Sequence, residues 1–384
     1  MRAYFDHNAT TPPDPAVAEA VARALTEDFG NASSVHHFGQ RAKALLDEAR
    51  SAVADLIGAE PAEIVFTSGG TEADNMALRG AAEAAETTPS RRHIIASSIE
   101  HEAVLNTVKA LGRRGWTATL LPVDASGIVS PGALAAAITR ETAIVSVMHA
   151  NNEIGTIQPI ADLAAIAHEH GAVFHTDAVQ SVAKIPVDVR ALGVDTLALS
   201  AHKFNGPKGA GALWVRRGVR LVSTMTGGKH ERNRRGGTEN VPGIAGLGVA
   251  ARLARGKLSG ETSRIGALRD RLEQGILAGV AGTVVNGATG SRVPNTTNIS
   301  FDGIEAESLL IALDLEGFAV STGSACSSGT LEPSHVLRAM GLPSHRTQNS
   351  IRFSLGAGNT EQQVDALVAK LPAVVSKLRT LVRR

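Results

Sequence analysis

The sequence predicts an α/β protein with a mainly parallel sheet, and three observations support this class. Short runs rich in β-branched and aromatic residues alternate with Ala-rich stretches whose apolar residues recur every three or four positions. The 384 residues are 43% hydrophobic and 20% charged, which is typical of a globular protein with a large core. No internal repeat or low-complexity tract interrupts the alternation. We therefore expect helices on both faces of the sheet, in two closely packed domains.

The apolar runs predict the strands and helices in order. The strands expected in the larger sheet are 63–68, 93–98, 117–123, 142–148, 173–178, 196–201 and 211–217. Helices are expected between them, for example at 71–86 and 163–171, and a long helix from about Ile244 to Val280. Shorter alternation follows, with expected strands at 295–301, 320–327 and 350–355. We predict a large domain at 14–256, and a smaller one made of 1–13 and 257–384.

Charge and cysteine content argue against several classes of protein. Lys and Arg number 38 against 37 Asp and Glu, so no strong field indicates a nucleic-acid or membrane partner. Cys326 is the only cysteine, which excludes an intramolecular disulfide and disfavours a zinc site. The first residues contain no apolar signal segment, and no apolar run reaches membrane-spanning length. We therefore expect a cytoplasmic protein.

Polar residues follow the predicted strands, at the edge where open α/β sheets bind ligands. Gly70 and Thr71 could hold a phosphate at a helix start, Asp177 and Gln180 follow a second strand, and Lys203 follows the next. Each alone has an ordinary explanation as a turn, a helix N-cap or a surface lysine. Together they match pyridoxal phosphate, which needs a phosphate anchor, an acid for its pyridine nitrogen and a lysine for its Schiff base.

Two further strand ends and one loop carry candidate groups. His101 could stack on a planar ring or move protons, and Asn151 and Asn152 could contact a substrate or a ring oxygen. Cys326 stands among Gly, Ser and Ala residues, a composition typical of an exposed loop. These neighbours alone leave a reactive thiol and an unreactive loop cysteine equally open.

A set of sequence segments spans nearly the whole chain and is distinctive as a set. The segments are YFDHNATTPPDP, FGNASSVHHFG, EIVFTSGGTEADN, MHANNEIGTIQPI, FHTDAVQ, SAHKFNGPKG, RRGGTENVPG, STGSACSSGTLEPSHVL and SIRFSL. In them the chain resembles the cysteine desulfurases of the NifS/IscS type. The resemblance implies PLP-dependent fold type I, with a seven-stranded sheet in the large domain and the cysteine loop in the small one. It also implies a homodimer.

The resemblance further implies roles for cofactor-binding residues. Lys203 would form the Schiff base with pyridoxal phosphate, Asp177 would pair with the pyridine nitrogen, and Gln180 would bond the ring oxygen. His101 would lie over the ring. The residues implied to contact the cofactor phosphate are Gly70, Thr71, Ser200 and His202, together with Thr238, which would reach the cofactor of the partner subunit.

The resemblance implies a reaction as well. Asn152, which would contact the cofactor too, and Arg352 would hold L-cysteine, whose Cα proton Lys203 would remove. The Cys326 thiolate would attack the substrate sulfur, giving a persulfide on Cys326 and, after protonation with His101 as a candidate donor, L-alanine. A nearby group, His335 or His101, is expected to favour the thiolate.

The resemblance leaves partners and alternatives open. Acceptors of the sulfur would be scaffold or carrier proteins of iron–sulfur cluster assembly, or of tRNA thiolation, and Cys326 could ligate a cluster transiently. One alternative is a selenocysteine lyase or an aminotransferase of the same fold, with Cys326 uninvolved. Another is a noncatalytic sulfur-assembly partner, against which the set Lys203, Asp177 and Gln180 argues.

Overall fold

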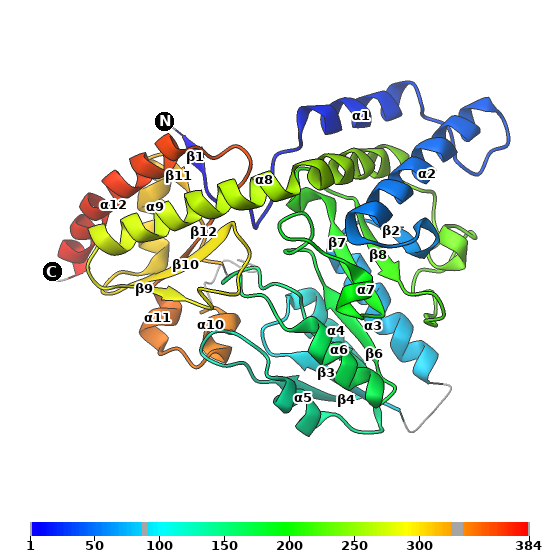
Figure 1. Cartoon of the computed structure of the whole chain (residues 1–384), viewed down its shortest axis with the longest axis horizontal. Helices are drawn as coiled ribbons and strands as arrows, with labels where there is room; N and C mark the ends of the chain where they lie inside the picture. Colours follow the sequence, from blue (N-terminus) through cyan, green and yellow to red (C-terminus); the bar gives the residue numbers. More distant parts are fainter. Residues whose placement is uncertain (1, 87–90, 324–332, 383–384) are drawn as a thin grey trace.

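The computed structural model describes residues 2–86, 91–323 and 333–382 (Figure 1). It contains a seven-stranded sheet, a three-stranded sheet and a two-stranded sheet. The strands are β1 Ala3–Tyr4, β2 Ile64–Thr67, β3 His93–Ser97, β4 Thr117–Leu121, β5 Thr142–Ser146, β6 Val173–Asp177, β7 Thr196–Ser200, β8 Gly211–Val215, β9 Thr283–Asn286, β10 Thr296–Phe301, β11 Phe318–Ala319 and β12 Ser350–Ser354. The helices are α1 Pro15–Thr26, α2 His37–Ile57, α3 Gly70–Ala85, α4 Glu102–Gly112, α5 Pro131–Ala137, α6 Ile160–Glu169, α7 Val189–Leu192, α8 Val241–Gly279, α9 Ala306–Leu315, α10 His335–Ala339, α11 Ser344–Gln348 and α12 Glu361–Val382.

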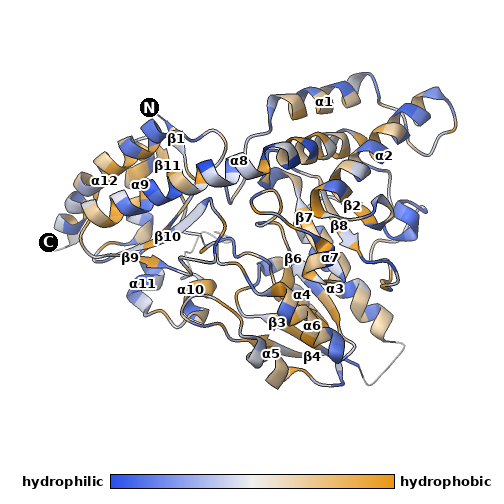
Figure 2. Ribbon diagram, in the orientation of Figure 1, coloured by the Kyte–Doolittle hydropathy of each residue, from blue (hydrophilic) through white to orange (hydrophobic). Residues whose placement is uncertain are grey.

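The large sheet is the mainly parallel sheet that the sequence predicts. Its strand order is β2-β8-β7-β6-β5-β3-β4, and only β8 runs antiparallel to its neighbours. Successive side chains point to opposite faces, so Ile95 and Val145 enter one apolar cluster while Ile94 and Ile144 enter another. Helices α2, α6 and α8 cover the first face, and α3 and α4 cover the second. Figure 2 shows the apolar residues of these strands between the two helical layers.

Helix α8 extends from one apolar core to the other (Figure 1). The Asn240 side chain caps it by accepting a hydrogen bond from the Gly243 N–H at 3.1 Å. Its first part packs Leu247 against the large sheet, and its second part packs Leu272 into the cluster of the three-stranded sheet. The predicted domain boundary at residue 256 lies inside this helix and stays a prediction.

The smaller part of the molecule is built on the antiparallel sheet β12-β10-β9, with α9, α12 and the end of α8 packed on it. The predicted strand at 320–327 is wrong for the residues described, 320–323, because the strand β11 ends at Ala319. Beyond it only Ser321 pairs, in an isolated bridge to Arg352, and Gly323 turns the chain with a φ of 88°. Strands β1, β9 and β11 are absent from the prediction.

Within the described ranges, no helix combines the length and apolarity that crossing a bilayer requires.

Candidate active site

The carboxyl edge of the large sheet gathers most of the predicted site residues. Asp177 is the last residue of β6 and Ser200 the last residue of β7, and Lys203 ends the short 3-10 turn that follows β7. His101 and Asn152 lie in the segments after β3 and β5. Because these strands are parallel neighbours, the loops after them lie at one edge of the sheet.

Lys203 is held by the N-terminal segment of the chain. Its Nζ donates hydrogen bonds to the carbonyl oxygens of Asn8, at 2.7 Å, and Ala9, at 2.8 Å. Burial, assisted by the charge of Arg352, lowers the pKa of Lys203 to about 8, although Asp177 opposes this shift. The amine is therefore partly neutral near physiological pH, as a nucleophilic or basic lysine requires.

Asp177 is a buried acid, with 5% of its surface exposed. Its Oδ1 accepts a hydrogen bond from the Val179 N–H at 2.9 Å. Burial and the nearby Asp74 carboxyl raise the pKa of Asp177 to about 7, while His101 acts in the opposite direction. No salt bridge joins Asp177 to a basic side chain within the described part of the chain. The carboxyl group is thus suited to a cationic nitrogen brought by a ligand.

Further buried acids stand behind Asp177 and were missed by the sequence analysis. His175 Nε2 lies 3.2 Å from Asp74 Oδ1, and burial raises the pKa of Asp74 to about 8. Glu100 accepts a hydrogen bond from the Met148 N–H at 2.6 Å through Oε1, whereas its buried Oε2 has no partner among the described residues. Asp74, Glu100 and His175 lie in the stretches TEADN, IEH and FHTD, whose residues alone do not predict that these side chains are buried.

The expected phosphate site lies where α3 begins beside the end of β7. A Cβ placed on Gly69 would lie 3.7 Å from Ser200 Oγ, and one placed on Gly70 would lie 2.6 Å from Val179 Cγ2. The exposed Thr71 occupies the first turn of α3, where N–H groups are free to bind an anion. Gly70 thus lets the start of α3 pack closely against Val179, and the free N–H groups of the first turn remain available to an anion.

Two other residues predicted at the phosphate are positioned differently. His202 Nδ1 lies 3.1 Å from Thr10 Oγ1, and burial with the charge of Lys203 lowers the pKa of His202 to about 4. Thr238 is exposed, and no hydrogen bond in the described ranges joins it to the residues around Lys203. His202 therefore lies in the site, whereas a role for Thr238 depends on contacts outside one chain.

Gln180 belongs to a buried polar cluster that the sequence analysis missed. Its Nε2 donates to the Asn8 carbonyl oxygen at 3.0 Å, and its Oε1 accepts a hydrogen bond from Lys184. Lys184 also donates to Asn8 Oδ1 at 2.9 Å, and burial lowers the pKa of Lys184. The cluster fixes the orientation of the Gln180 amide.

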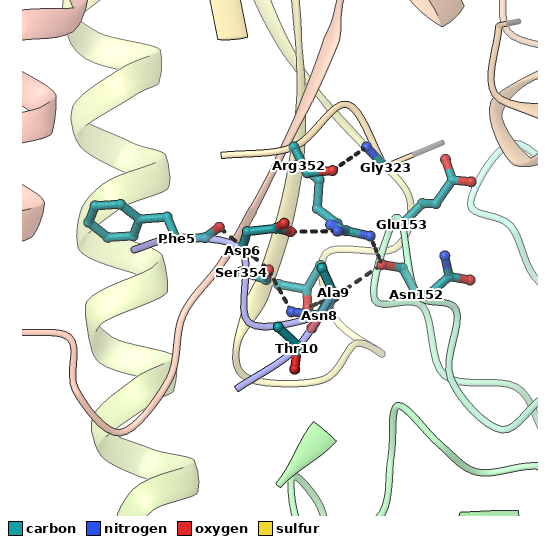
Figure 3. Close-up of polar contacts among 12 residues, drawn as sticks. Phe5, Asp6, Asn8, Ala9, Thr10, Asn152, Glu153, Gly323, Arg352 and Ser354 are labelled. Carbon is teal, nitrogen blue, oxygen red and sulfur yellow. Dashed lines mark hydrogen bonds and ion pairs between the residues drawn. The ribbon is translucent and has the colours of Figure 1, made fainter. Parts of the chain in front are cut away.

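Arg352, on β12 of the smaller part, reaches the same region (Figure 3). Its Nη1 donates to the Asn152 carbonyl oxygen at 3.0 Å, and its Nη2 donates to Asp6 Oδ1 at 2.6 Å. The structure thus brings together Arg352 and Asn152, two of the predicted site residues, through the Asn152 backbone. Asp6 was missed, although it lies in the quoted segment YFDHNATTPPDP.

His101 and the flanks of the cysteine segment complete the site. His101 is exposed and caps α4, with Nδ1 accepting from the Ala103 N–H at 3.1 Å. Cys326 lies outside the described residues. Beyond it, Ser334 Oγ donates to the buried Glu153 carboxylate at 2.6 Å, and His335 Nε2 lies 3.0 Å from the Glu100 carbonyl oxygen.

These groups fit pyridoxal phosphate. A buried acid without a basic partner suits the pyridine nitrogen, the amine of Lys203 suits the cofactor carbonyl, and the glycine turn suits the phosphate. A site lined mainly by apolar side chains, without these polar groups, would instead have indicated a different ligand.

Comparison with known proteins extends over almost the whole chain. The pattern of the aminotransferase class-V family matches residues 3–367. A cysteine desulfurase IscS of Dictyoglomus turgidum is 48% identical over 378 residues, which cover 98% of this chain and 95% of that protein. A cysteine desulfurase of Gluconacetobacter diazotrophicus is 50% identical over 380 residues, covering 98% and 94%. A solved structure of a NifS-like protein superposes with a TM-score of 0.92 at 39% identity, covering 98% of this chain and 100% of that one.

Proposed function

The chain belongs to the aminotransferase class-V family and, within it, to the cysteine desulfurases, and we propose that it moves sulfur from L-cysteine to its own Cys326. The products are L-alanine and a persulfide on Cys326. The observation that best supports this assignment is the meeting of Lys203, Asp177 and Arg352 at one edge of the large sheet. An amine, an acid and a carboxylate-binding group are what an amino-acid substrate and its cofactor require.

The enzyme depends on pyridoxal phosphate, which supplies, when bound, an electrophilic carbonyl and an electron sink. Lys203 would attach it, Asp177 would pair with its ring nitrogen, and Gln180, oriented by Lys184, would contact its ring oxygen. The residues that would hold its phosphate are Gly70, Thr71, Ser200 and His202.

The chain's own side chains would carry out the remaining work. Arg352 and Asn152 would hold the substrate carboxylate, and the neutral Lys203 amine would accept the Cα proton. The Cys326 thiolate would form a bond to the substrate sulfur as the substrate C–S bond breaks, and the substrate Cβ would gain a proton to give alanine. His101, exposed at the edge of the site, would donate this proton.

A homodimer and sulfur acceptors are part of the proposal. The exposure of Thr238 supports a contact with the cofactor of a partner subunit. The acceptors would be scaffold or carrier proteins of iron–sulfur cluster assembly, and the single cysteine supports a cytoplasmic location, where thiols stay reduced. Light scattering of the cofactor-loaded protein tests the dimer, since a monomeric mass would contradict it.

Mass spectrometry after incubation with L-cysteine tests the function. The Cys326 peptide should gain one sulfur atom, and the supernatant should contain alanine. Cys326→Ala should bind the cofactor normally and form no persulfide, whereas Lys203→Ala should lose both cofactor binding and persulfide formation. A 2-keto acid in place of alanine would indicate an aminotransferase instead. Sulfide release by Cys326→Ala at the parent rate would contradict the role of the thiol.

A further inference from the structure

Asp6 and Arg352 form an ion pair between two segments whose positions are fixed by backbone hydrogen bonds (Figure 3). The Ser354 N–H donates to the Phe5 carbonyl oxygen at 2.8 Å, and the His7 N–H donates to the Ser354 carbonyl oxygen at 3.1 Å. Asp6 therefore lies in register beside β12, the strand that carries Arg352. These bonds hold the Asp6 backbone next to the strand, which keeps its carboxylate within reach of the guanidinium.

The guanidinium of Arg352 is held at two points and keeps donors free. The side chain is 5% exposed, with Nη1 bound to the Asn152 carbonyl oxygen and Nη2 bound to Asp6. The Asn152 oxygen is itself fixed by the Asn8 amide, which donates to it at 3.1 Å. The buried Nε has no partner among the described residues. A guanidinium has more N–H donors than these contacts use, so a carboxylate can still bind.

Asp6 could affect substrate binding in two opposite ways. It could compete with the substrate carboxylate for the guanidinium, or it could fix the plane of the guanidinium so that the remaining donors face the substrate. The geometry favours the second effect, because the two hydrogen-bond partners of Arg352, Asp6 and the Asn152 carbonyl oxygen, lie in segments that are themselves held by hydrogen bonds. A guanidinium whose orientation is already fixed loses less conformational entropy when the substrate carboxylate binds.

We propose that Asp6 is a positioning residue that orients Arg352 for the α-carboxylate of the amino-acid substrate. The inference rests on the proposed function, since it assigns to that site the choice of amino acids over simple amines. Asp6 acts through Arg352 and does not contact the reacting atoms.

Steady-state kinetics of the cofactor-loaded enzyme provide the first test. In Asp6→Ala we expect the KM for L-cysteine to rise about tenfold and kcat to stay within about twofold, because one charge-assisted hydrogen bond to the guanidinium is lost. Asp6→Asn keeps an acceptor oxygen and should give a smaller rise. Asp365→Ala is the matched control, because it removes the carboxylate of another Asp–Arg pair, with Arg271 at 2.6 Å, on the surface of the small part. It should change neither constant.

Calorimetric binding of L-alanine and of ethylamine separates orientation from general damage. Asp6→Ala should weaken binding of L-alanine about tenfold and leave ethylamine, which lacks a carboxylate, unchanged. An unchanged or lower KM in Asp6→Ala and Asp6→Asn would overturn the inference, as would equal losses for both ligands. If Asp6→Ala does not fold, Asp6→Asn decides by the same criteria. If the parent forms no alanine from cysteine, the proposed function fails, and the two binding constants alone decide the role of Asp6.

Discussion

Asp177→Asn should make the cofactor-free protein more stable while it removes activity. In the folded chain burial and Asp74 raise the pKa of Asp177 from 3.8 to about 7. Folding then favours the protonated acid, so the free energy of unfolding falls as pH rises from 3.8 to about 7 and is lowest above that range. The difference in pKa corresponds to an upper limit of about 4 kcal/mol of lost stability.

The uncharged amide that Asp177→Asn introduces would not ionise, so the variant avoids this loss in the free energy of unfolding. The Asn side chain can still accept the hydrogen bond that the Val179 N–H donates to Asp177. For a chain of 384 residues, about 4 kcal/mol corresponds to a rise in Tm of about 5 °C. At about pH 5 the expected gain shrinks to about 2 kcal/mol, because less of the ionisation penalty then applies.

Thermal unfolding of the cofactor-free parent and variant at about pH 8 and pH 5 measures this effect. Glu273→Gln is a control that should lower the stability. Burial raises the pKa of Glu273, but the hydrogen bonds from Arg292 and Thr297 outweigh it and hold that pKa below its usual value. In the cofactor-loaded enzyme, Asp177→Asn should lower kcat about 100-fold or more. A variant that is no more stable than the parent at the higher pH would refute the reasoning.

Three further predictions concern single groups in the structure. Arg50→Met should destabilise the fold by about 3 kcal/mol in urea unfolding, because it leaves Glu231 buried without the guanidinium that contacts it at 2.8 Å. The exposed pair of Arg190 and Glu60 provides the control, and Arg190→Met should destabilise the fold by under about 0.5 kcal/mol. Gly356→Ala should cost about 2 kcal/mol in the same assay, since its Cβ would lie 2.3 Å from His7 Nδ1, and an unchanged unfolding midpoint would contradict that contact. The rate at which the cofactor-free protein takes up the cofactor, measured by absorbance, should increase as pH rises, with a midpoint at about 8, because only the neutral amine of Lys203 reacts. A rate independent of pH would argue against Lys203 as the attachment site.

The sequence predicted the residues whose position follows from the ends of parallel strands. Asp177 and Lys203 follow long apolar runs, and the topology of an open α/β sheet places such residues at one edge. The family pattern and the NifS-like structure confirm the predicted fold, PLP-dependent fold type I. Strands β1 and β11 escaped prediction because two residues each are too few to show a period. The four-residue edge strand β9 was also missed.

The missed residues share a different origin. Asp6 and Asn8 meet Arg352 and Thr296 across nearly the whole length of the chain, and no local pattern reports such contacts. Burial converts ordinary acids such as Glu100 into groups with raised pKa values, and burial depends on tertiary packing. Cys326 remains a prediction from sequence and resemblance, since the structure does not describe it.

The continuous helix α8 has a mechanical consequence. Its 39 residues span about 58 Å, and its ends are embedded in two separate apolar cores. Between those ends, side-chain contacts also hold the helix in place, such as the ion pair of Arg255 with Asp55 at 3.1 Å and the hydrogen bond from Thr262 Oγ1 to the Lys184 carbonyl oxygen at 3.0 Å. Lys203 follows residues of the first core and Arg352 lies between residues of the second, so α8 is a rigid link between the two parts of the molecule that carry these side chains.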